Sequence, residues 1–238
     1  MEKPIRLALL ASGSGTTCEQ IFRACQKCGE LFGLVEPVCL VISSADAGAI
    51  NRLKNAGFAG EIYICNPKIV GKEKFADELI SIFQKEKIDW FGQYGWLPLM
   101  PVEVIKKFHG INQHPAPVPF FGGRGMYGRT PHAAIINFRY LVGRPVKTEA
   151  TAQIVAEKYD AGEIIATMLT EVRENDMVKS LQARVLPLEW KTQIEALKII
   201  SENNGEILPA KSNFTLLPGE EKILLKAKEQ AIKSYPKG

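Results

Sequence analysis

The sequence has few residues that would bind a metal ion or form disulfide bonds. It contains three histidines and five cysteines, an odd number, and four of the cysteines lie between Cys18 and Cys39. Cys25 and Cys28 make one Cys-x-x-Cys pair, but no second cysteine pair or histidine pair stands at the spacing of a zinc site. We therefore expect structural or incidental roles for the cysteines, and no metal site.

Long apolar stretches and a strong excess of one charge are also missing. The apolar run at residues 7–11 is too short to span a membrane and lacks a signal-peptide cleavage context. The 30 Lys and Arg against 26 Asp and Glu give a net charge of +4, which permits an anionic substrate without indicating nucleic-acid binding. We expect a cytoplasmic protein with no membrane or nucleic-acid partner.

The first half of the chain alternates strand-like and helix-like segments. Its 238 residues suffice for one large α/β domain or two small ones. Such alternation predicts an α/β fold with a Rossmann-like, mostly parallel sheet flanked by helices, in which ligands bind at the carboxyl ends of the strands. The predicted strands are 5–11, 35–43, 61–65 and 88–94, and the predicted helices follow residue 17 and cover 47–56, 72–87 and 101–108.

The second half reads differently. Residues 149–156 and 163–172 alternate like strands on either side of an Asp160-Ala161-Gly162 turn, which predicts an antiparallel C-terminal extension of the sheet. A long helix is predicted over 177–200, and a lysine-rich surface helix over 220–234. We expect one domain over residues 1–204 and a C-terminal tail over 205–238 that packs on it or extends it.

A glycine-rich turn follows the first predicted strand, with the sequence Ser12-Gly13-Ser14-Gly15-Thr16-Thr17. Glycines let the backbone approach a ligand closely, and the start of the following helix presents free N–H groups to an anion. The turn lacks the third glycine of the dinucleotide fingerprint and the lysine of the phosphate loop. It supports phosphate binding, and the alternative is a plain capped strand-to-helix turn.

The segment Asn112-Gln113-His114-Pro115 is the best candidate for a catalytic centre. In an extended chain, residues two apart point to the same side, so Asn112 and His114 can face one reacting atom. An amide N–H stabilises a developing oxyanion, and an imidazole transfers protons near neutral pH. Prolines at 115, 117 and 119 stiffen the chain that follows. The alternative is a packed asparagine and histidine without a chemical role.

A catalytic histidine needs a partner that orients its ring, and Asp160 is the best candidate. A carboxylate beside the ring would hold one tautomer and stabilise the charged form. The alternative for Asp160 is a purely structural turn residue. The other histidines, His109 and His132, have no comparable setting, and we expect them at the surface or supporting other residues.

Taken in order, these motifs resemble the folate-dependent formyltransferase family, and most closely its phosphoribosylglycinamide formyltransferases. The resemblance covers roughly residues 5–200. It comprises the Ser12–Thr17 turn, the Asn112-x-His114-Pro115 segment, the Asp160-x-Gly162 turn, and Ala183-Arg184-Val185 with Glu189 downstream. Each motif alone is loose, but four in register are specific, and the resemblance implies a formyltransferase catalytic domain over 1–204.

The resemblance implies transfer of a formyl group from 10-formyltetrahydrofolate, as co-substrate, to the amine of glycinamide ribonucleotide in purine biosynthesis. Its substrates are then small molecules, a folate and a phosphorylated amine, and the protein is a monomer or homodimer. The implied residues fall into four groups: catalytic Asn112, His114 and Asp160; phosphate-binding Gly13, Gly15, Thr16 and Thr17; substrate-binding Glu189 and Pro115; and folate-binding Lys72, Trp96, Leu97, Pro98, Leu99, Met100 and Asn112.

The chain departs from the family pattern mainly in the loop at residues 120–129, which is longer and richer in Gly and Arg than usual. Arg124 or Arg129 there can meet an anion, or simply be solvated. Pro98 stands where the family often has Arg, and Gln153 where it often has His. These departures leave open another acceptor, such as an amino-sugar nucleotide, and a non-catalytic folate- or nucleotide-binding module. Methionyl-tRNA formylation and deformylation are less expected, because the additional domains of those enzymes are not found in this sequence.

Overall fold

The computed structural model describes residues 3–236 and residue 238. These residues form two compact units. Unit 1 comprises residues 3–113, 154–157 and 194–207, and unit 2 comprises residues 114–153, 158–193, 208–236 and 238. No helix over the described residues has both the length and the apolar character that crossing a membrane requires.

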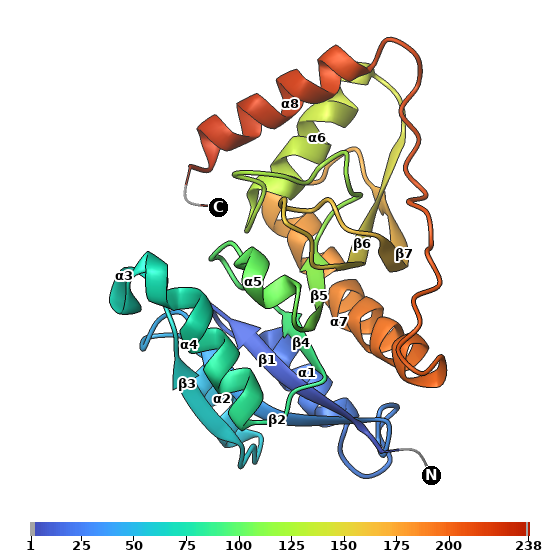
Figure 1. Ribbon diagram of the computed structural model, residues 1–238. Helices are drawn as coiled ribbons and strands as arrows, with labels where there is room; N and C mark the ends of the chain where they lie inside the picture. Colours follow the sequence, from blue (N-terminus) through green and yellow to red (C-terminus); the bar gives the residue numbers. More distant parts are fainter. Residues whose placement is uncertain (1–2, 237) are drawn as a thin grey trace. The chain divides into compact units, whose positions relative to one another are not determined.

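Unit 1 is built on parallel strands that follow the order β3-β2-β1-β4-β5 (Figure 1). Leu7, Ala8, Leu9 and Leu10 on consecutive positions of β1 are all fully buried, so both faces of this strand are covered. The strands are β1 (Ile5–Ala11), β2 (Val35–Ile42), β3 (Glu61–Ile64), β4 (Trp90–Gln93) and β5 (His109–His114).

The helices of unit 1 connect these strands. They are α1 (Thr16–Ala24), α2 (Ala49–Asn55), α3 (Pro67–Val70), α4 (Lys72–Lys85) and α5 (Val102–Ile105). The amphipathic helix α4 buries Phe75, Leu79 and Phe83 in a core that includes Ala8 and Leu10 of the sheet. The turn after β1 and the loop after β4 therefore lie at the carboxyl edge of a parallel sheet, as the sequence predicts.

Unit 2 contains an antiparallel pair of strands and helices. Strands β6 (Val146–Ile154) and β7 (Ile164–Val172) pair from Val146 opposite Val172 at one end to Gln153 opposite Ile164 at the other. Helix α6 is Thr130–Val142, and α7 (Val178–Glu202) runs through Pro187 without a break. Residues of α7 up to 193 belong to unit 2. The predicted fold class, a mostly parallel sheet with an antiparallel C-terminal pair, is confirmed.

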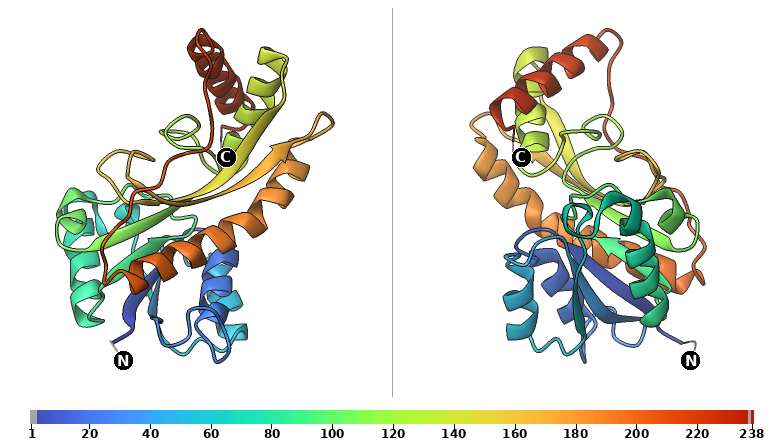
Figure 2. Two further views of the ribbon diagram at one scale, coloured as in Figure 1. Left: turned by 90° about the vertical axis from the view of Figure 1, so that its right-hand side faces the viewer. Right: turned by 60° about the vertical axis from the view of Figure 1, so that its left-hand side comes forward.

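The C-terminal segment is part of the core of unit 2. From residue 208 the chain runs extended toward α8 (Glu221–Ser234), the red helix in Figure 2. Ala210 N donates to Ile164 O at 2.7 Å, and α8 lies along α6 in Figure 1, where Asn137 Nδ2 donates to Ala227 O at 3.3 Å. The prediction of a solvated helix is right for the lysine-bearing face only, since the opposite face buries Leu224, Ala227 and Ala231.

Helix α6 is not among the predicted elements. Its residues are mostly apolar, and seven of them are buried, so it lacks the polar stripe that marks a surface helix. Two ordinary signals do mark its ends: Pro131 lies in the first turn, and Gly143 ends the helix with a left-handed φ of 65°. The sequence therefore marks the two ends of the helix but not the pattern between them.

Candidate active site

His114 and Asp160 meet in unit 2, as the sequence predicts. His114 Nδ1 lies 3.3 Å from Asp160 Oδ1, and their side chains are only 4% and 8% exposed. His114 is the last residue of β5, and Asp160 follows β6 in the turn before β7. In this shielded setting a carboxylate can orient the imidazole and stabilise its charged form.

Besides His114, two hydrogen-bond donors of unit 2 hold Asp160 in place. Gly123 N donates to Oδ2 at 2.9 Å, and Gln153 Nε2 donates to Oδ1 at 3.0 Å. Asp160 itself has a left-handed φ of 53°, which Asp tolerates better than most residues. The structural and the chemical interpretations of Asp160 are therefore compatible: it forms the turn, and the turn directs its carboxylate at His114.

Gly122 makes room for Asp160. A Cβ on Gly122 would lie 2.4 Å from Asp160 Cβ, which is closer than real Cβ contacts come. The sequence analysis did not predict site roles for Gly122, Gly123 or Gln153. It noted only that the 120–129 loop and the Gln153 position depart from the family pattern. The contacts that connect them to Asp160 span 37 and 7 positions of sequence, so the sequence alone gives no direct signal for them.

The other ring nitrogen of His114 also faces an acceptor. Nε2 lies 2.9 Å from the backbone oxygen of Phe121, which is fully buried. A carbonyl oxygen only accepts, so Nε2 carries a hydrogen in this arrangement. A neutral ring then presents its Nδ1 lone pair to Asp160, whereas a doubly protonated ring donates to both oxygens. The geometry therefore suits an imidazole that takes up and releases a proton during a reaction.

His132 is buried, and His109 is exposed. His132 lies in the first turn of α6, with 1% of its surface accessible. Burial, and to a lesser extent the charge of the nearby His114, lower the pKa of His132 to about 4. His132 is therefore neutral at physiological pH. Of the two places expected for these histidines, His109 takes the surface position, and the burial of His132 leaves the supporting position for it.

The glycine-rich turn of unit 1 has the form that the sequence predicts. Gly15 stands at the start of α1 with a left-handed φ of 70°, and a Cβ there would lie 2.5 Å from Ala49 Cβ. Gly15 is therefore required both by its backbone angle and by the close approach of α2. Of the residues predicted to bind phosphate, Gly13 is exposed, Thr16 is half-buried and Thr17 is buried.

Ser12 joins this turn to the loop after β4. Its hydroxyl accepts from Leu97 N at 2.9 Å and lies 2.6 Å from Ser43 Oγ, while Ser12 N donates to Gly95 O at 3.1 Å. The phosphate-type turn and the predicted folate loop are thus neighbours within unit 1. Ser12 was not predicted to be important beyond its membership of the motif.

The predicted folate residues of unit 1 divide by exposure. Trp96 and Met100 are buried in its core, where the Trp96 ring stacks on Phe75 with centroids 6.4 Å apart. Leu97 and Leu99 are 52% and 47% exposed. Pro98 is half-buried, and Lys72 is exposed at the start of α4. The Gly95–Met100 loop therefore exposes backbone groups and two leucine side chains to solvent, and the buried Trp96 side chain holds the loop on the core of unit 1.

The remaining predicted residues lie on both units. Asn112 of β5, half-buried, belongs to unit 1. Pro115, half-buried, and Glu189 of α7, buried, belong to unit 2 with His114 and Asp160. The structure thus brings together the His–Asp pair in one unit, and the turn with the Gly95 loop in the other.

The loop that departs from the family pattern is partly buried. Phe121 and Met126 lie in the core of unit 2, whereas Arg124 and Arg129 are exposed. Lys228 of α8 donates from Nζ to Gly122 O at 2.8 Å. The loop is therefore anchored by its apolar residues and by the C-terminal helix.

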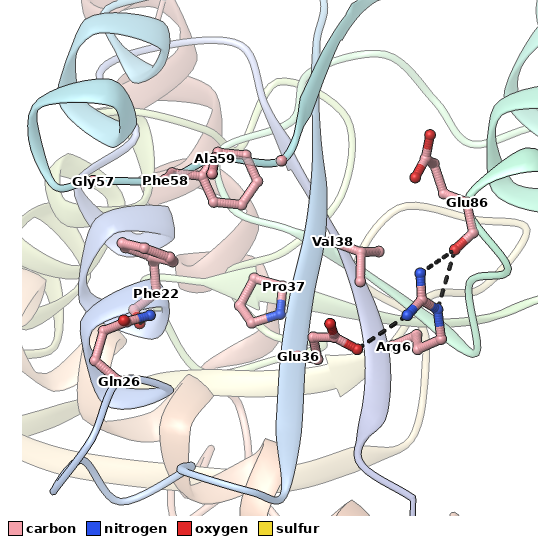
Figure 3. Close-up of a pocket in the computed structure, with 11 residues that line it drawn as sticks. Arg6, Phe22, Gln26, Glu36, Pro37, Val38, Gly57, Phe58, Ala59 and Glu86 are labelled. Carbon is pink, nitrogen blue, oxygen red and sulfur yellow. Dashed lines mark hydrogen bonds and ion pairs between the residues drawn. The ribbon is translucent and has the colours of Figure 1, made fainter.

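A cavity of about 400 Å³ in unit 1 lies away from these residues, at the amino end of the sheet (Figure 3). Its charged groups already have structural partners. Arg6 Nη1 contacts Glu36 Oε2 at 3.0 Å, and Arg6 Nη2 donates to Glu86 O at 2.9 Å. Ligands of parallel α/β sheets bind at the opposite edge, so we do not include this cavity in the site.

Comparison with known proteins agrees with this architecture. A glycinamide ribonucleotide transformylase 1 from Symbiobacterium toebii, of known structure, matches with a TM-score of 0.74 and 23% identity over 91% of this chain and 96% of that one. This likeness establishes the fold. The family model described as formyl transferase matches residues 5–197. The chain belongs to the formyl transferase family.

Two plant relatives are phosphoribosylglycinamide formyltransferases described as chloroplastic. The protein of Vigna unguiculata is 32% identical over 201 residues, which make up 83% of this chain and 61% of that protein. The protein of Arabidopsis thaliana is 31% identical over 199 residues, 83% of this chain and 65% of that protein. This chain therefore spans less than two thirds of the length of these relatives.

Proposed function

We propose that the chain transfers a formyl group from 10-formyltetrahydrofolate to the amine of glycinamide ribonucleotide. The observation that carries the proposal is the shielded His114–Asp160 pair, with Asn112 two residues before His114 on the same strand. The names of the two plant relatives support the choice of acceptor.

In the proposed reaction the substrate amine attacks the formyl carbon and forms a new C–N bond. The carbonyl oxygen becomes an oxyanion, which the Asn112 amide and the protonated His114 ring stabilise. The intermediate then collapses, the bond to N10 of the folate breaks, and the proton released by the amine is delivered to N10. Asp160 holds the His114 ring through these transfers.

The substrates are proposed to bind at the predicted groups. Gly13, Gly15, Thr16 and Thr17 hold the phosphate of the acceptor, where the start of α1 offers backbone N–H groups. Glu189 and Pro115 contact its glycinamide portion. The folate binds Lys72, Asn112 and the Gly95–Met100 loop, mostly through backbone groups because the Trp96 and Met100 side chains are buried.

Formyl transfer to another amine, such as an amino-sugar nucleotide, is the second candidate. The 120–129 loop favours it, because its exposed Arg124 and Arg129 can meet a second anionic group. A non-catalytic binding module is the third candidate, and the presence of both members of the His–Asp pair argues against it.

Steady-state assays of the purified protein with 10-formyltetrahydrofolate decide among these candidates. We expect turnover on glycinamide ribonucleotide and its loss in His114→Ala, with His109→Ala, an exposed histidine, as the matched control. Turnover only on an amino-sugar nucleotide would replace the acceptor. Binding of folate without turnover on any amine would leave the non-catalytic module.

We also propose a cytoplasmic protein that works on small molecules alone, as a monomer or homodimer. All five cysteines are free, which suits a reducing compartment. Cell fractionation tests the location, and light scattering after size exclusion tests the oligomeric state. Retention of the protein on immobilised nucleic acid would contradict the assignment of small-molecule partners alone.

A further inference from the structure

One peptide group of unit 2 lies between two oppositely charged side chains. The N–H of Gly123 donates to Asp160 Oδ2 at 2.9 Å. The carbonyl oxygen of Gly122, which belongs to the same peptide group, accepts from Lys228 Nζ at 2.8 Å. This peptide therefore joins an ammonium group on α8 to the carboxylate that contacts His114.

A peptide held in this way is polarised. A cation on the carbonyl oxygen draws electron density from the amide, so the N–H becomes a stronger donor to the carboxylate. The negative charge of Asp160 in turn favours the charged form of Lys228. Burial lowers the pKa of Lys228, and the charge of Asp160 opposes that shift, so the two groups interact electrostatically.

The peptide cannot easily be built from other residues. A side chain on Gly122 would collide with Asp160, and Gly123 has a left-handed φ of 102°. The backbone at Lys228 is also held in position, because the neighbouring Ala227 is buried against α6 and its carbonyl oxygen accepts a hydrogen bond from Asn137. Helix α8 lies beyond residues 5–197, which are the part that matches the family model.

We propose that Lys228 is a positioning residue of the active site. It holds and polarises the Gly122–Gly123 peptide, whose N–H fixes the Asp160 carboxylate in the orientation that meets His114. The proposal rests on the proposed roles of His114 and Asp160 in formyl transfer. A purely structural role, in which Lys228 only anchors the loop, is the competing explanation.

The test compares Lys228→Met with Lys228→Gln, Lys228→Arg and the control Lys226→Met. Lys226 is exposed on the same helix, so its change removes one charge without touching the loop. Gln retains an N–H donor, on a side chain one bond shorter, but carries no charge, and Arg keeps both the charge and the donor. The set therefore separates the charge from the hydrogen bond.

We expect Lys228→Met to lower kcat about tenfold with KM within about twofold, and Lys228→Arg to restore most of the loss. The midpoint of the pH profile of kcat/KM should move upward by roughly half a unit, because removing a nearby positive charge makes protons of the site harder to lose. Lys228→Gln should fall between Met and Arg, and Lys226→Met should match the wild type.

The Gly123 amide provides a readout that needs no turnover. In two-dimensional NMR its proton should move upfield in Lys228→Met and exchange faster with solvent, since its hydrogen bond to Asp160 weakens. This result holds even if no amine is formylated, so it separates the inference from the proposed function. If Lys228→Met does not fold, Lys228→Gln is measured at Gly123 in the same way.

A fall in melting temperature with an unchanged Gly123 resonance and an unchanged kcat would overturn the proposal and leave Lys228 as an anchor only. An equal effect of Lys226→Met would also overturn it, since the result would then reflect net charge rather than the contact with Gly122.

Discussion

Asp160 is held by three different groups: a backbone N–H, an amide side chain and an imidazole. Its neighbours come from three separate segments, β5, β6 and the 120–129 loop. These donors already fix the orientation of the Asp160 carboxylate, so little further orientational freedom has to be lost during the reaction. The proposed reaction then depends on the negative charge of Asp160.

We expect Asp160→Asn to lower kcat by about a hundredfold or more, because the neutral amide cannot stabilise the charged His114 ring. Substrate dissociation constants should change by no more than about threefold. Kinetics together with calorimetric binding measure the two quantities, and Glu163→Gln, an exposed carboxylate nearby in sequence, is the control. A large loss of binding with normal turnover would contradict this role.

Gly122→Ala should displace Asp160, since its Cβ would stand 2.4 Å from that of the aspartate. We expect a loss of about 1–3 kcal/mol in unfolding free energy and a fall in kcat. Gly205→Ala is the matched control: Gly205 has a left-handed φ of 84° and open space around it, so only stability should fall. A normal kcat in Gly122→Ala would show that the Asp160 position is not critical.

The C-terminal segment lies outside the region that matches the family model, residues 5–197, and it adds buried side chains to the core of unit 2. Phe214 lies in an aromatic cluster with Phe120, Phe121 and Phe138, with ring centroids 5.0 to 5.7 Å apart. Because Phe121 also supplies the carbonyl that faces His114, this cluster connects the tail to the candidate site.

Phe214→Ala is expected to lower the free energy of unfolding by about 3–5 kcal/mol, because it leaves a cavity among packed rings. The midpoint of urea denaturation measures the change. Leu217→Ala, at a residue 44% exposed in the same segment, should cost less than about 0.5 kcal/mol. Similar losses in the two variants would mean that the aromatic cluster does not stabilise the tail.

Arg144 and Glu220 connect the end of α6 to the start of α8 through a two-bond contact of 2.7 and 2.8 Å. The hydrogen bonds from Arg144 are the main cause that lowers the pKa of Glu220. A lowered carboxyl pKa contributes stability above the ordinary value of about 4.3, and that stability is lost as pH falls through the lowered value.

The stability difference between the wild type and Glu220→Gln should therefore be on the order of 1 kcal/mol at pH 7 and shrink below about pH 4. Denaturation at a series of pH values measures it. A difference that stayed constant to pH 3 would show that the ionised form of Glu220 is not responsible. Arg144→Gln should behave in the same way, since it removes the other partner.

For the chain as a whole, the position of the domain boundary is open to a direct test. The proposed boundary at residue 204 treats 205–238 as a tail that packs on or extends the domain. Phe214, Leu224, Ala227 and Ala231 are nonetheless buried in the core of unit 2. We expect a chain ending at residue 204 to lose cooperative unfolding and become sensitive to protease, because this core is then open to water. A compact and active truncated protein would establish 1–204 as a self-sufficient domain.

Much of the fold was predictable because its signals are local. Strand-helix alternation, glycine at the start of α1 and the amphipathic pattern of α4 are properties of short windows. Helix α6 was missed because its residues are mostly apolar and show no clear polar stripe. The buried face of α8 was missed because its small alanines carry a weak hydrophobic signal beside many lysines. The sequence left a surface and a supporting position open for His132, since burial of a single histidine leaves no periodic mark.

The sequence was enough to indicate the class of chemistry, because Asn112-x-His114-Pro115, Asp160-x-Gly162 and the Gly15 turn are short motifs that, taken in order, resemble those of the formyltransferase family. It could not indicate what holds Asp160. The contacts from Gly123 and, through the Gly122 carbonyl, from Lys228 join residues 37 and 106 positions apart. Such contacts depend on how separate elements pack in three dimensions, and no local pattern of residues encodes them.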